Sequence, residues 1–247
     1  MLKLKRVKYK NKFVNIYEDR GLVFGFTELG FALPDMAAFF ELSHIIELKQ
    51  VHSDMVLCGS RIEPGDEGDG IILEQENRIA VIKTADCVPL FFWDKDFAFG
   101  GIIHVGWQGL HKGIEKRLLE LLVEKSPPVD PGNLYFYLGP SIERACYEVG
   151  QDLYEMFSKK SYREGIFFEP AVPPGIPISA GKKYLLDIKK GIALSLQEEG
   201  IRAEQVMSSG ICTFCERERF PSYRRDNKTG SRIYNFLFFR SGLEKKS

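Results

Sequence analysis

The sequence predicts an α+β fold. Short apolar runs rich in β-branched or aromatic residues, such as 79–82 and 233–239, indicate strands. At 113–125 and 185–198, apolar residues instead recur every three or four positions, as in amphipathic helices. The two patterns mix along the chain without regular alternation, which favours α+β over a doubly wound fold. The 247 residues allow one large domain or two small ones.

The first half of the chain is dominated by strand patterns. Predicted strands cover 13–17, 22–26, 79–82, 88–93 and 98–104. We expect Gly25 and Gly30 to mark turns, and the last two strands to form a hairpin. That hairpin would place Cys87 and His104 at the same end of neighbouring strands.

Helical patterns become frequent in the second half. The helix predicted at 113–125 is stopped by Pro127 and Pro128, because proline lacks an amide hydrogen and restricts the preceding residue. The helix at 185–198 is closed by Gly200 as a C′ residue. The other predicted elements are a strand at 134–138, a short helix at 152–159, a loop or linker at 171–177 and a strand at 233–239.

Composition excludes several classes of protein. Lys+Arg and Asp+Glu both number 34, which argues against a dedicated nucleic-acid partner. No stretch approaches 18 apolar residues, so we expect no membrane span, and the basic start lacks the apolar run of a secretory signal. Five cysteines are an odd number in a chain of this size, which favours a reduced, cytoplasmic setting over a disulfide framework.

His52, Cys87 and His104 stand in short islands of unusual local chemistry. Two imidazoles and a thiolate suit Zn(II), and three protein ligands rather than four would leave one position open, as in catalytic zinc sites. The spacing is no metal signature, so the alternative is two core histidines and a buried free cysteine. Asp86, next to Cys87, could support a ligating imidazole or cap the turn after its strand.

A basic segment near the C-terminus offers an anion site. Guanidinium groups bind phosphate through paired hydrogen bonds, and the alternative for any one of these residues is a solvated loop. The segment contains Arg217, Arg219, Arg224, Arg225, Lys228 and Arg232.

Cys212 and Cys215 form a Cys-x-x-Cys motif. Such a motif is a redox pair, half of a zinc site or a loop with two thiols. No second Cys-x-x-Cys or histidine pair follows, which argues against a structural zinc knuckle. Cys58 and Cys146 show no ligand-like neighbours in the sequence and are expected to be buried free thiols.

Taken together, six ordered islands carry a family resemblance. They are Gln50-Val51-His52, Thr84-Ala85-Asp86-Cys87-Val88-Pro89, His104-Val105-Gly106-Trp107, Gly139-Pro140-Ser141-Ile142, Cys146-Tyr147-Glu148-Val149, and Cys212-Thr213 with Ser222-Tyr223-Arg224-Arg225. This order resembles the YfiH/YlmD family, also called the laccase-domain or polyphenol oxidase family. The motifs run from residue 50 to about 239, which is most of the chain.

The resemblance implies one domain over residues 1–247, with a mixed β-sheet core flanked by helices. It implies one Zn(II) per chain held by His52, Cys87 and His104, which would also be the catalytic residues. The implied activity is purine nucleoside phosphorylase, which cleaves adenosine, inosine and methylthioadenosine with phosphate to free base and ribose-1-phosphate. Adenosine deaminase is implied as a side activity. Nucleoside and phosphate are the expected partners, with Asp86, Arg224 and Arg225 as substrate or phosphate residues; no oligomeric state follows.

Copper is possible but not favoured. A multicopper oxidase needs about ten histidines, since imidazole is the usual copper ligand. This chain has four.

The sequence departs from the family pattern at Gln108. The usual motif is His-Ala-Gly-Trp-Arg-Gly, and here Gln108 replaces the arginine and Val105 replaces the alanine. A fixed cation that could hold phosphate is therefore missing at this position. Arg224 and Arg225 are the residues that would supply the charge.

Two other functions fit the same residues. Cys87 as a thiolate nucleophile with His104 as its base would make a cysteine hydrolase or amidase. Alternatively, the chain is a non-catalytic, metal-dependent ligand-binding protein. Bound metal, measured by elemental analysis, separates the nucleophile interpretation from the others, and a ribose-1-phosphate assay with adenosine and phosphate separates an enzyme from a binding protein.

Overall fold

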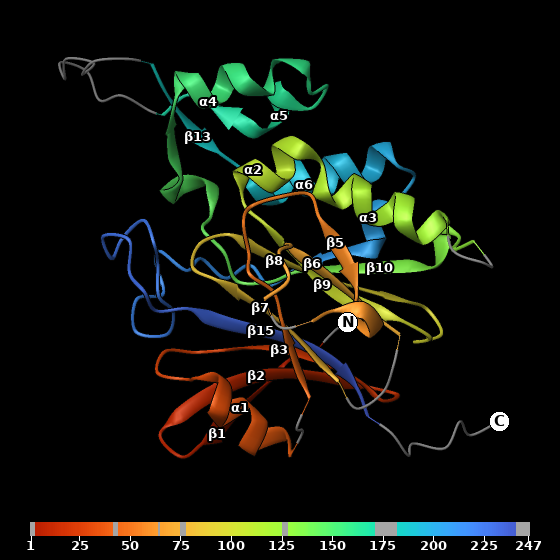
Figure 1. Ribbon diagram of the computed structural model, residues 1–247. Helices are drawn as coiled ribbons and strands as arrows, with labels where there is room; N and C mark the ends of the chain where they lie inside the picture. Colours follow the sequence, from red (N-terminus) through yellow and green to blue (C-terminus); the bar gives the residue numbers. More distant parts are fainter. Residues whose placement is uncertain are drawn as a thin grey trace.

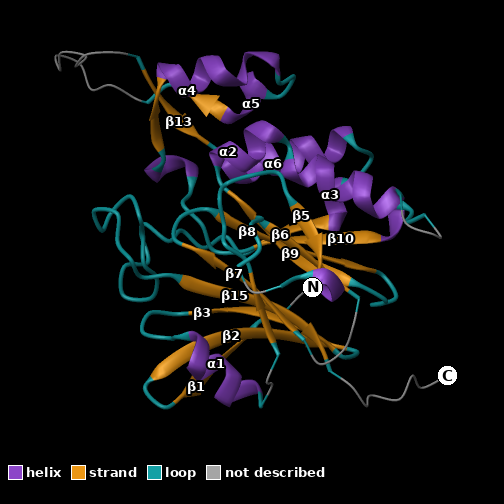
Figure 2. Ribbon diagram, in the orientation of Figure 1, coloured by secondary structure: helices purple, strands orange, loops and turns teal. Residues whose placement is uncertain are grey.

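The chain folds into two stacked β-sheets, with several helices over the outer face of one sheet and a single short helix on the outer face of the other, in the computed structural model shown in Figures 1 and 2. The structure describes residues 3–41, 44–63, 65–74, 78–124, 128–170 and 182–240. This arrangement confirms the predicted α+β class, with two large mixed sheets in place of one.

The first sheet has six strands and is antiparallel except for the β4–β7 pair. Its order is β1 (Lys5–Tyr9), β2 (Lys12–Asp19), β3 (Leu22–Thr27), β15 (Ile233–Phe239), β7 (Ile79–Thr84) and β4 (Ile45–Glu47). Helix α1 (Leu33–Phe40) packs on its outer face, where the Phe40 ring contacts Phe236 and Phe238.

The second sheet also has six strands, with parallel pairs at its two edges. Its order is β14 (Val206–Ser208), β10 (Leu134–Leu138), β8 (Val88–Asp94), β9 (Gly100–Val105), β6 (Gly70–Leu73) and β5 (Val56–Cys58). A three-stranded sheet of β11 (Glu148–Gly150), β13 (Lys183–Leu186) and β12 (Phe167–Phe168) lies beyond the helices.

Helices α2 (Trp107–Lys112), α3 (Ile114–Val123) and α6 (Ile188–Glu198) cover the second sheet on the side away from the first. Two short helices, α4 (Gln151–Met156) and α5 (Arg163–Ile166), accompany the small sheet.

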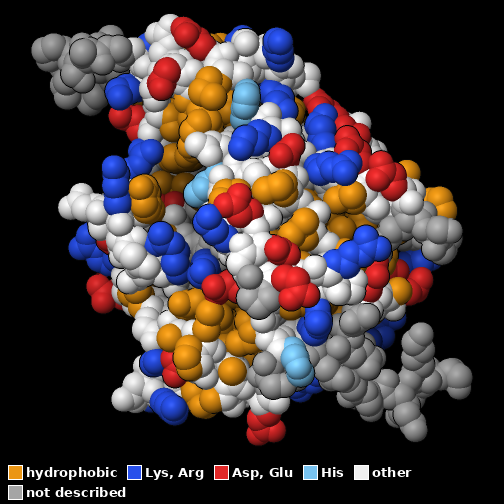
Figure 3. All heavy atoms as spheres, in the orientation of Figure 1, with side chains coloured by type: hydrophobic (Ala, Val, Ile, Leu, Met, Phe, Trp, Pro, Cys, Tyr) orange, Lys and Arg blue, Asp and Glu red, His pale blue; other side chains and the backbone are white. Residues whose placement is uncertain are grey.

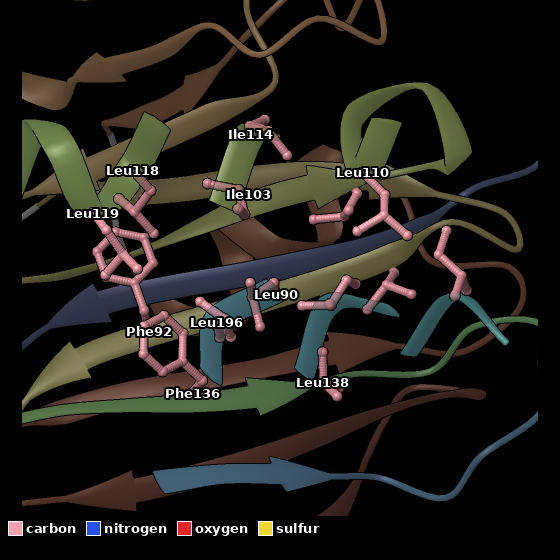
Figure 4. Close-up of a cluster of buried hydrophobic side chains, with 14 of the residues drawn as sticks. Leu90, Phe92, Ile103, Leu110, Ile114, Leu118, Leu119, Phe136, Leu138 and Leu196 are labelled. Carbon is pink, nitrogen blue, oxygen red and sulfur yellow. The ribbon is translucent and has the colours of Figure 1, made fainter. Parts of the chain in front are cut away.

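The second sheet is buried on both faces, which creates two hydrophobic cores. On one face Phe91 contacts Phe24 of the first sheet at a ring-centroid distance of 5.0 Å. On the other face Phe92 belongs to the core beneath the helices, with Leu118 and Leu196 (Figure 4). Neighbouring residues of a strand point to opposite faces, so a strand covered on both sides needs apolar residues throughout. This explains the continuous apolar run of β8.

Most predicted elements are confirmed, including the β8–β9 hairpin and the strand at 233–239. Gly25 is not in a turn but lies within β3, where a Cβ would meet the Asn15 carbonyl oxygen. The helix predicted at 185–198 begins only at Ile188, because the preceding residues form β13. The predicted loop at 171–177 lies outside the described residues, and the single domain stays a prediction.

Charges of both signs are interspersed over the face shown in Figure 3, in keeping with the even charge balance. Among the described residues, no helix is long and apolar enough to cross a membrane.

Glu115 is a buried acid at the interface of α3 and α6. The Ser195 hydroxyl donates to its Oε1 at 2.5 Å, whereas Oε2 has no hydrogen-bond partner among the described residues. Burial raises the pKa of Glu115 from 4.5 to about 7, and the Ser195 hydrogen bond and the charges of Lys160 and Lys116 offset only part of this rise. The folded protein therefore favours the protonated acid.

Glu115→Gln should stabilise the protein at neutral and alkaline pH. A raised carboxyl pKa means that stability is highest below pH 4.5 and falls as the pH rises to about 7, by about 3 kcal/mol. The amide removes this loss, so urea unfolding should show a gain over wild type at pH 8 that shrinks toward pH 5. Glu120→Gln, on the exposed side of the same helix, is the control. An equal effect of Glu115→Gln at both pH values would contradict this account.

Candidate metal centre and substrate pocket

A pocket of about 760 Å³ lies where the chain passes between the two large sheets. Three connections between the sheets contribute to its wall: β4 to β5, β7 to β8, and β14 to β15. Further contributions come from the end of β9 with the start of α2, from the segment between β10 and β11, and from the start of α6. The lining side chains include Lys49, Gln50, His52, Lys83, Asp86, Cys87, His104, Trp107, Gln108, Ile142, Tyr147, Ile188, Tyr223, Arg224 and Arg232.

His52, Cys87 and His104 come together in this pocket. Their ligand atoms all lie within 4.8 Å of one another. The strand register explains part of this, because Pro89 pairs with His104 and so Cys87 ends up at the same end of the hairpin. The predicted placement of Cys87 beside His104 is therefore confirmed.

Asp69 orients the buried imidazole of His104. The Asp69 Oδ1 lies 2.8 Å from His104 Nδ1, and its Oδ2 accepts hydrogen bonds from the Ser53 amide at 2.6 Å and the Ser53 hydroxyl at 2.7 Å. Burial would raise the pKa of Asp69, but the hydrogen bonds from His104 and Ser53 lower it to about 2. A carboxylate on Nδ1 leaves Nε2 for the centre of the cluster, as is usual around metal-ligating histidines.

The partner of the imidazole is thus Asp69 and not Asp86. Asp69 lies just before β6 in an acidic stretch with Asp66 and Glu67, and no motif in the sequence distinguishes it from them. Its alignment with His104 depends on the pairing of β6 with β9.

The protein stabilises Cys87 in its thiolate form. Burial alone would raise the pKa of the Cys87 thiol, but His104 and His52 outweigh it and lower the pKa to about 6. Burial alone would lower the pKa of His104, but Cys87 and the hydrogen bond with Asp69 outweigh it and raise the pKa of this imidazole to about 9. A thiolate is the form in which cysteine binds metal or acts as a nucleophile.

Backbone strain accumulates at this cluster. His52 has φ 55° and Asp86 has φ 86°, both in the left-handed region that non-glycine residues rarely adopt. Such conformations persist where the surrounding structure enforces them, and they concentrate at functional sites. Gly106 adds a close approach, since a Cβ there would lie 3.0 Å from Cys87 Sγ and 3.4 Å from His52 Cδ2.

Gly106→Ala should therefore weaken metal binding while leaving the fold intact. The methyl group would push Cys87 and His52 apart by a few tenths of an ångström, and we expect about a 10–100-fold loss of metal affinity, as for other disturbances around ligands. Competition with a chelator measures the affinity. Gly230→Ala, at a glycine with open space around it and no positive φ, controls for the general cost of the substitution. Unchanged affinity in Gly106→Ala would mean that the site relaxes freely.

Asp86 holds a loop. Its carboxylate accepts hydrogen bonds from the Thr213 hydroxyl at 2.7 Å, the Ser222 hydroxyl at 2.9 Å and the Arg224 amide at 2.7 Å. Asp86 therefore positions the segment that carries Arg224 at the pocket.

Arg224 and Arg225 have different surroundings. Arg224 lines the pocket, lies over the Tyr147 ring at 5.1 Å and donates to the Glu148 carbonyl oxygen at 2.6 Å. Arg225 does not line it; its guanidinium donates to the carbonyl oxygens of Thr213, Phe214 and Phe220 and to the Asp226 carboxylate. Arg225 therefore braces the turn at 212–215, and the arginines that line the pocket are Arg224 and Arg232.

Several pocket residues were missed by sequence reasoning. Lys83 and Lys49 add cationic groups, although each also pairs with a glutamate, Glu47 and Glu67 respectively. The Gln50 amide is hydrogen-bonded to the Lys83 backbone on both sides at 2.8 Å, which ties the His52 loop to β7. The motif Gln50-Val51-His52 could be recognised in the sequence, whereas no motif marked the two lysines as pocket residues.

The donor set fits Zn(II). Two imidazoles and a thiolate match zinc in ligand type, their donor atoms converge, and His104 has the carboxylate support typical of such centres. Three protein ligands facing a pocket give the open arrangement of a catalytic rather than a structural metal site.

An α+β protein with a three-ligand metal site in a cationic pocket is the class that the fold and the site define. The sequence profile of the family described as multi-copper polyphenol oxidoreductase laccase matches residues 33–239, and the chain belongs to this family.

Relatives in this family carry the name purine nucleoside phosphorylase. The protein YlmD of Bacillus subtilis is 32% identical over 173 residues, which are 68% of this chain and 58% of that protein. The chain thus matches less than two thirds of that relative. A purine nucleoside phosphorylase of Aquifex aeolicus is 34% identical over 187 residues, covering 74% of this chain and 77% of the other.

Solved structures share the fold. YfiH of Bacillus licheniformis superposes with a TM-score of 0.79 at 21% identity and covers 92% of this chain and 96% of its own. YlmD of Geobacillus stearothermophilus gives a TM-score of 0.76 at 22% identity, with 96% and 99% covered.

Proposed function

We propose that this protein is a zinc-dependent purine nucleoside phosphorylase that cleaves adenosine, inosine and methylthioadenosine with phosphate to free base and ribose-1-phosphate. The observation that carries the proposal is the convergence of His52, Cys87 and His104 at a pocket that also contains Arg224 and Arg232. The names of the relatives support the same reaction. The free thiols support a reducing, cytoplasmic location.

The pocket supplies the parts that phosphorolysis needs. The transition state resembles a ribosyl cation, as in glycoside hydrolysis, so phosphate must be held on one face of the sugar. Arg224 and Arg232 position the phosphate, and Ile142, Ile188 and Tyr147 provide a largely apolar surface for the purine. The zinc, held by His52, Cys87 and His104, supplies Lewis acidity at the reacting centre.

We propose adenosine deamination as a side activity of the same pocket. Deamination replaces phosphate by water as the attacking group and moves the reaction from the sugar to C6 of the base. It does not need a bound phosphate, so it should persist when phosphate is removed.

The test is to incubate the zinc-loaded protein with adenosine and to measure adenine and ribose-1-phosphate with and without phosphate. We expect both products to rise together with phosphate concentration. If adenine forms at an unchanged rate without phosphate, the reaction is hydrolysis and not phosphorolysis. If the zinc-loaded protein forms the products of neither reaction, the remaining interpretation is a non-catalytic ligand-binding protein.

A second candidate function has one observation in its favour. Cys87, His104 and Asp69 follow one another as thiolate, imidazole and carboxylate, which is the order of a cysteine hydrolase or amidase triad. In that case the chain would work without metal, and Cys87 would be its most reactive thiol.

Gln108→Arg should lower the phosphate KM. Gln108 lines the pocket, so an arginine there would add a charge-assisted hydrogen bond of roughly 1.5–3 kcal/mol, which is about a 10–150-fold change. Initial rates at varied phosphate measure it. Gln108→Met, of similar length and without charge, is the control. An unchanged or higher KM would mean that the existing arginines already saturate the phosphate.

A further inference from the structure

Three cysteines outside the pocket lie together although they are far apart in the sequence. Cys146 ends the short 3-10 helix Arg144–Cys146, and Cys212 and Cys215 flank the turn after β14. Their sulfur atoms lie within 4.8 Å of one another, and the Cys146 and Cys215 sulfurs are 3.4 Å apart. The expectation that Cys146 has no ligand-like partner is therefore wrong, because the third thiol of the Cys-x-x-Cys motif comes from upstream.

The backbone around Cys212 is arranged to stabilise a thiolate. The Glu143 amide donates to its sulfur at 3.5 Å. Burial would raise the pKa of Cys212, but this amide and those of Cys215 and Phe214 lower it. Amide groups that converge on a cysteine sulfur are the support that a ligating thiolate needs.

Hydrogen bonds fix the backbone of the turn that carries Cys212 and Cys215. The Glu216 amide donates to the Cys212 carbonyl oxygen at 3.0 Å, and Arg225 donates to the carbonyl oxygens of Thr213 and Phe214 at 2.8 and 2.7 Å. The sulfur atoms of Cys212 and Cys215 are therefore held in place without a disulfide.

We propose that Cys146, Cys212 and Cys215 form a second metal site that binds one Zn(II) ion. Zinc–sulfur bonds of about 2.3 Å in a tetrahedron place two sulfurs about 3.8 Å apart, within the range that this cluster spans. Three thiolates are soft ligands and prefer Zn(II) over Mg(II) or Ca(II). Cys215 is exposed, so water completes the coordination.

The three thiols are crowded without a cation. The Cys146 and Cys215 sulfurs are 3.4 Å apart and all three sulfurs lie within 4.8 Å of one another, so three thiolates here would repel one another. A divalent ion reverses this effect, since it favours all three thiolates, and its binding releases their protons.

A metal ion bound by these three cysteines would stabilise the wall of the pocket. Thr213 lies between the two cysteines of the turn, and its hydroxyl donates to Asp86, the neighbour of Cys87. The ion would therefore join the segment after β10 to the turn after β14 and secure the loop that carries Arg224. The three cysteines do not line the pocket, so this ion would brace the loop without contacting the substrate.

The test uses the full chain with the pocket site removed, as His52→Ala/Cys87→Ala. After zinc loading under reducing conditions and desalting, this variant should keep one zinc per chain by elemental analysis. Adding Cys146→Ser or Cys212→Ser should reduce the content to near zero, whereas adding Cys58→Ser should not. With Co(II), the thiolate-to-metal charge-transfer band should follow the same order.

Wild type provides a second route if the pocket variant folds poorly. It should bind two zinc ions per chain, and Cys215→Ser should bind one. Loss of all zinc from the folded pocket variant, or zinc content unaffected by the three serine substitutions, would overturn the proposal. So would a Cys146–Cys215 disulfide found by mass spectrometry under the loading conditions, because it would assign the cluster to redox chemistry. No readout involves catalysis, so the result stands independently of the proposed function.

Discussion

Cys87→Ala is expected to abolish tight zinc binding in the pocket and to reduce phosphorolysis by more than about 100-fold. Loss of a partner around a ligand already costs roughly 10–100-fold in affinity or activity, and a lost ligand should cost more. His52→Ala and His104→Ala should have the same effect, because the three donor atoms converge on one centre. Cys58→Ala, at a thiol that lies 3.4 Å from the Ser60 hydroxyl and does not line the metal-site pocket, is the matched control.

Alkylation separates the ligand role of Cys87 from a nucleophile role. A metal-bound thiolate has its lone pairs engaged and should react slowly with iodoacetamide, then faster after chelation. Chelation should also stop turnover, and added zinc should restore it. Rapid labelling of Cys87 with zinc present, together with activity that survives full chelation, would reject the zinc mechanism in favour of the cysteine hydrolase.

Arg224→Ala should raise the phosphate KM by about 10–150-fold, which corresponds to one charge-assisted hydrogen bond of roughly 1.5–3 kcal/mol. Arg224 lines the pocket, and Asp86 fixes its backbone through the amide hydrogen bond. Initial rates at varied phosphate and saturating adenosine measure the change. We expect the KM for adenosine to change less, since the arginine is assigned to phosphate.

Arg217→Ala is the control for net charge, because Arg217 lies on the same segment but is exposed and outside the pocket. Equal effects of both substitutions would show a general electrostatic contribution in place of a phosphate contact. If the phosphate KM of Arg224→Ala equals that of wild type, the phosphate contact would be assigned to Arg232 or Lys83 instead.

The sequence predicts the parts of this protein that depend on local pattern. Hydrophobic periodicity places the β8–β9 hairpin and β15, and the hairpin in turn places Cys87 beside His104. The short strands β4, β5 and β14 were not predicted, since three residues are too few to show a period. Their positions come from neighbouring strands.

Long-range pairing decides the rest of the site. Asp69 meets His104 because β6 pairs with β9, and Cys146 meets Cys215 across 69 positions. Arg224 and Arg225 are adjacent and chemically identical, yet one faces the pocket and the other braces a turn. Composition and spacing cannot separate such neighbours, because the difference lies only in the direction of the side chain.

The geometry of the pocket depends on how the two large sheets stack, because chain segments that connect the sheets contribute to its wall. His52 and Cys87 lie on separate segments that leave the first sheet for the second, while His104 belongs to the second sheet alone. The ligand set is therefore assembled only after the sheets have docked through contacts such as Phe24 with Phe91. An isolated sheet has no complete set of these ligands. In the mature protein, metal affinity reports on the alignment of the layers, so a cavity in the inter-sheet core would impair the centre without touching it.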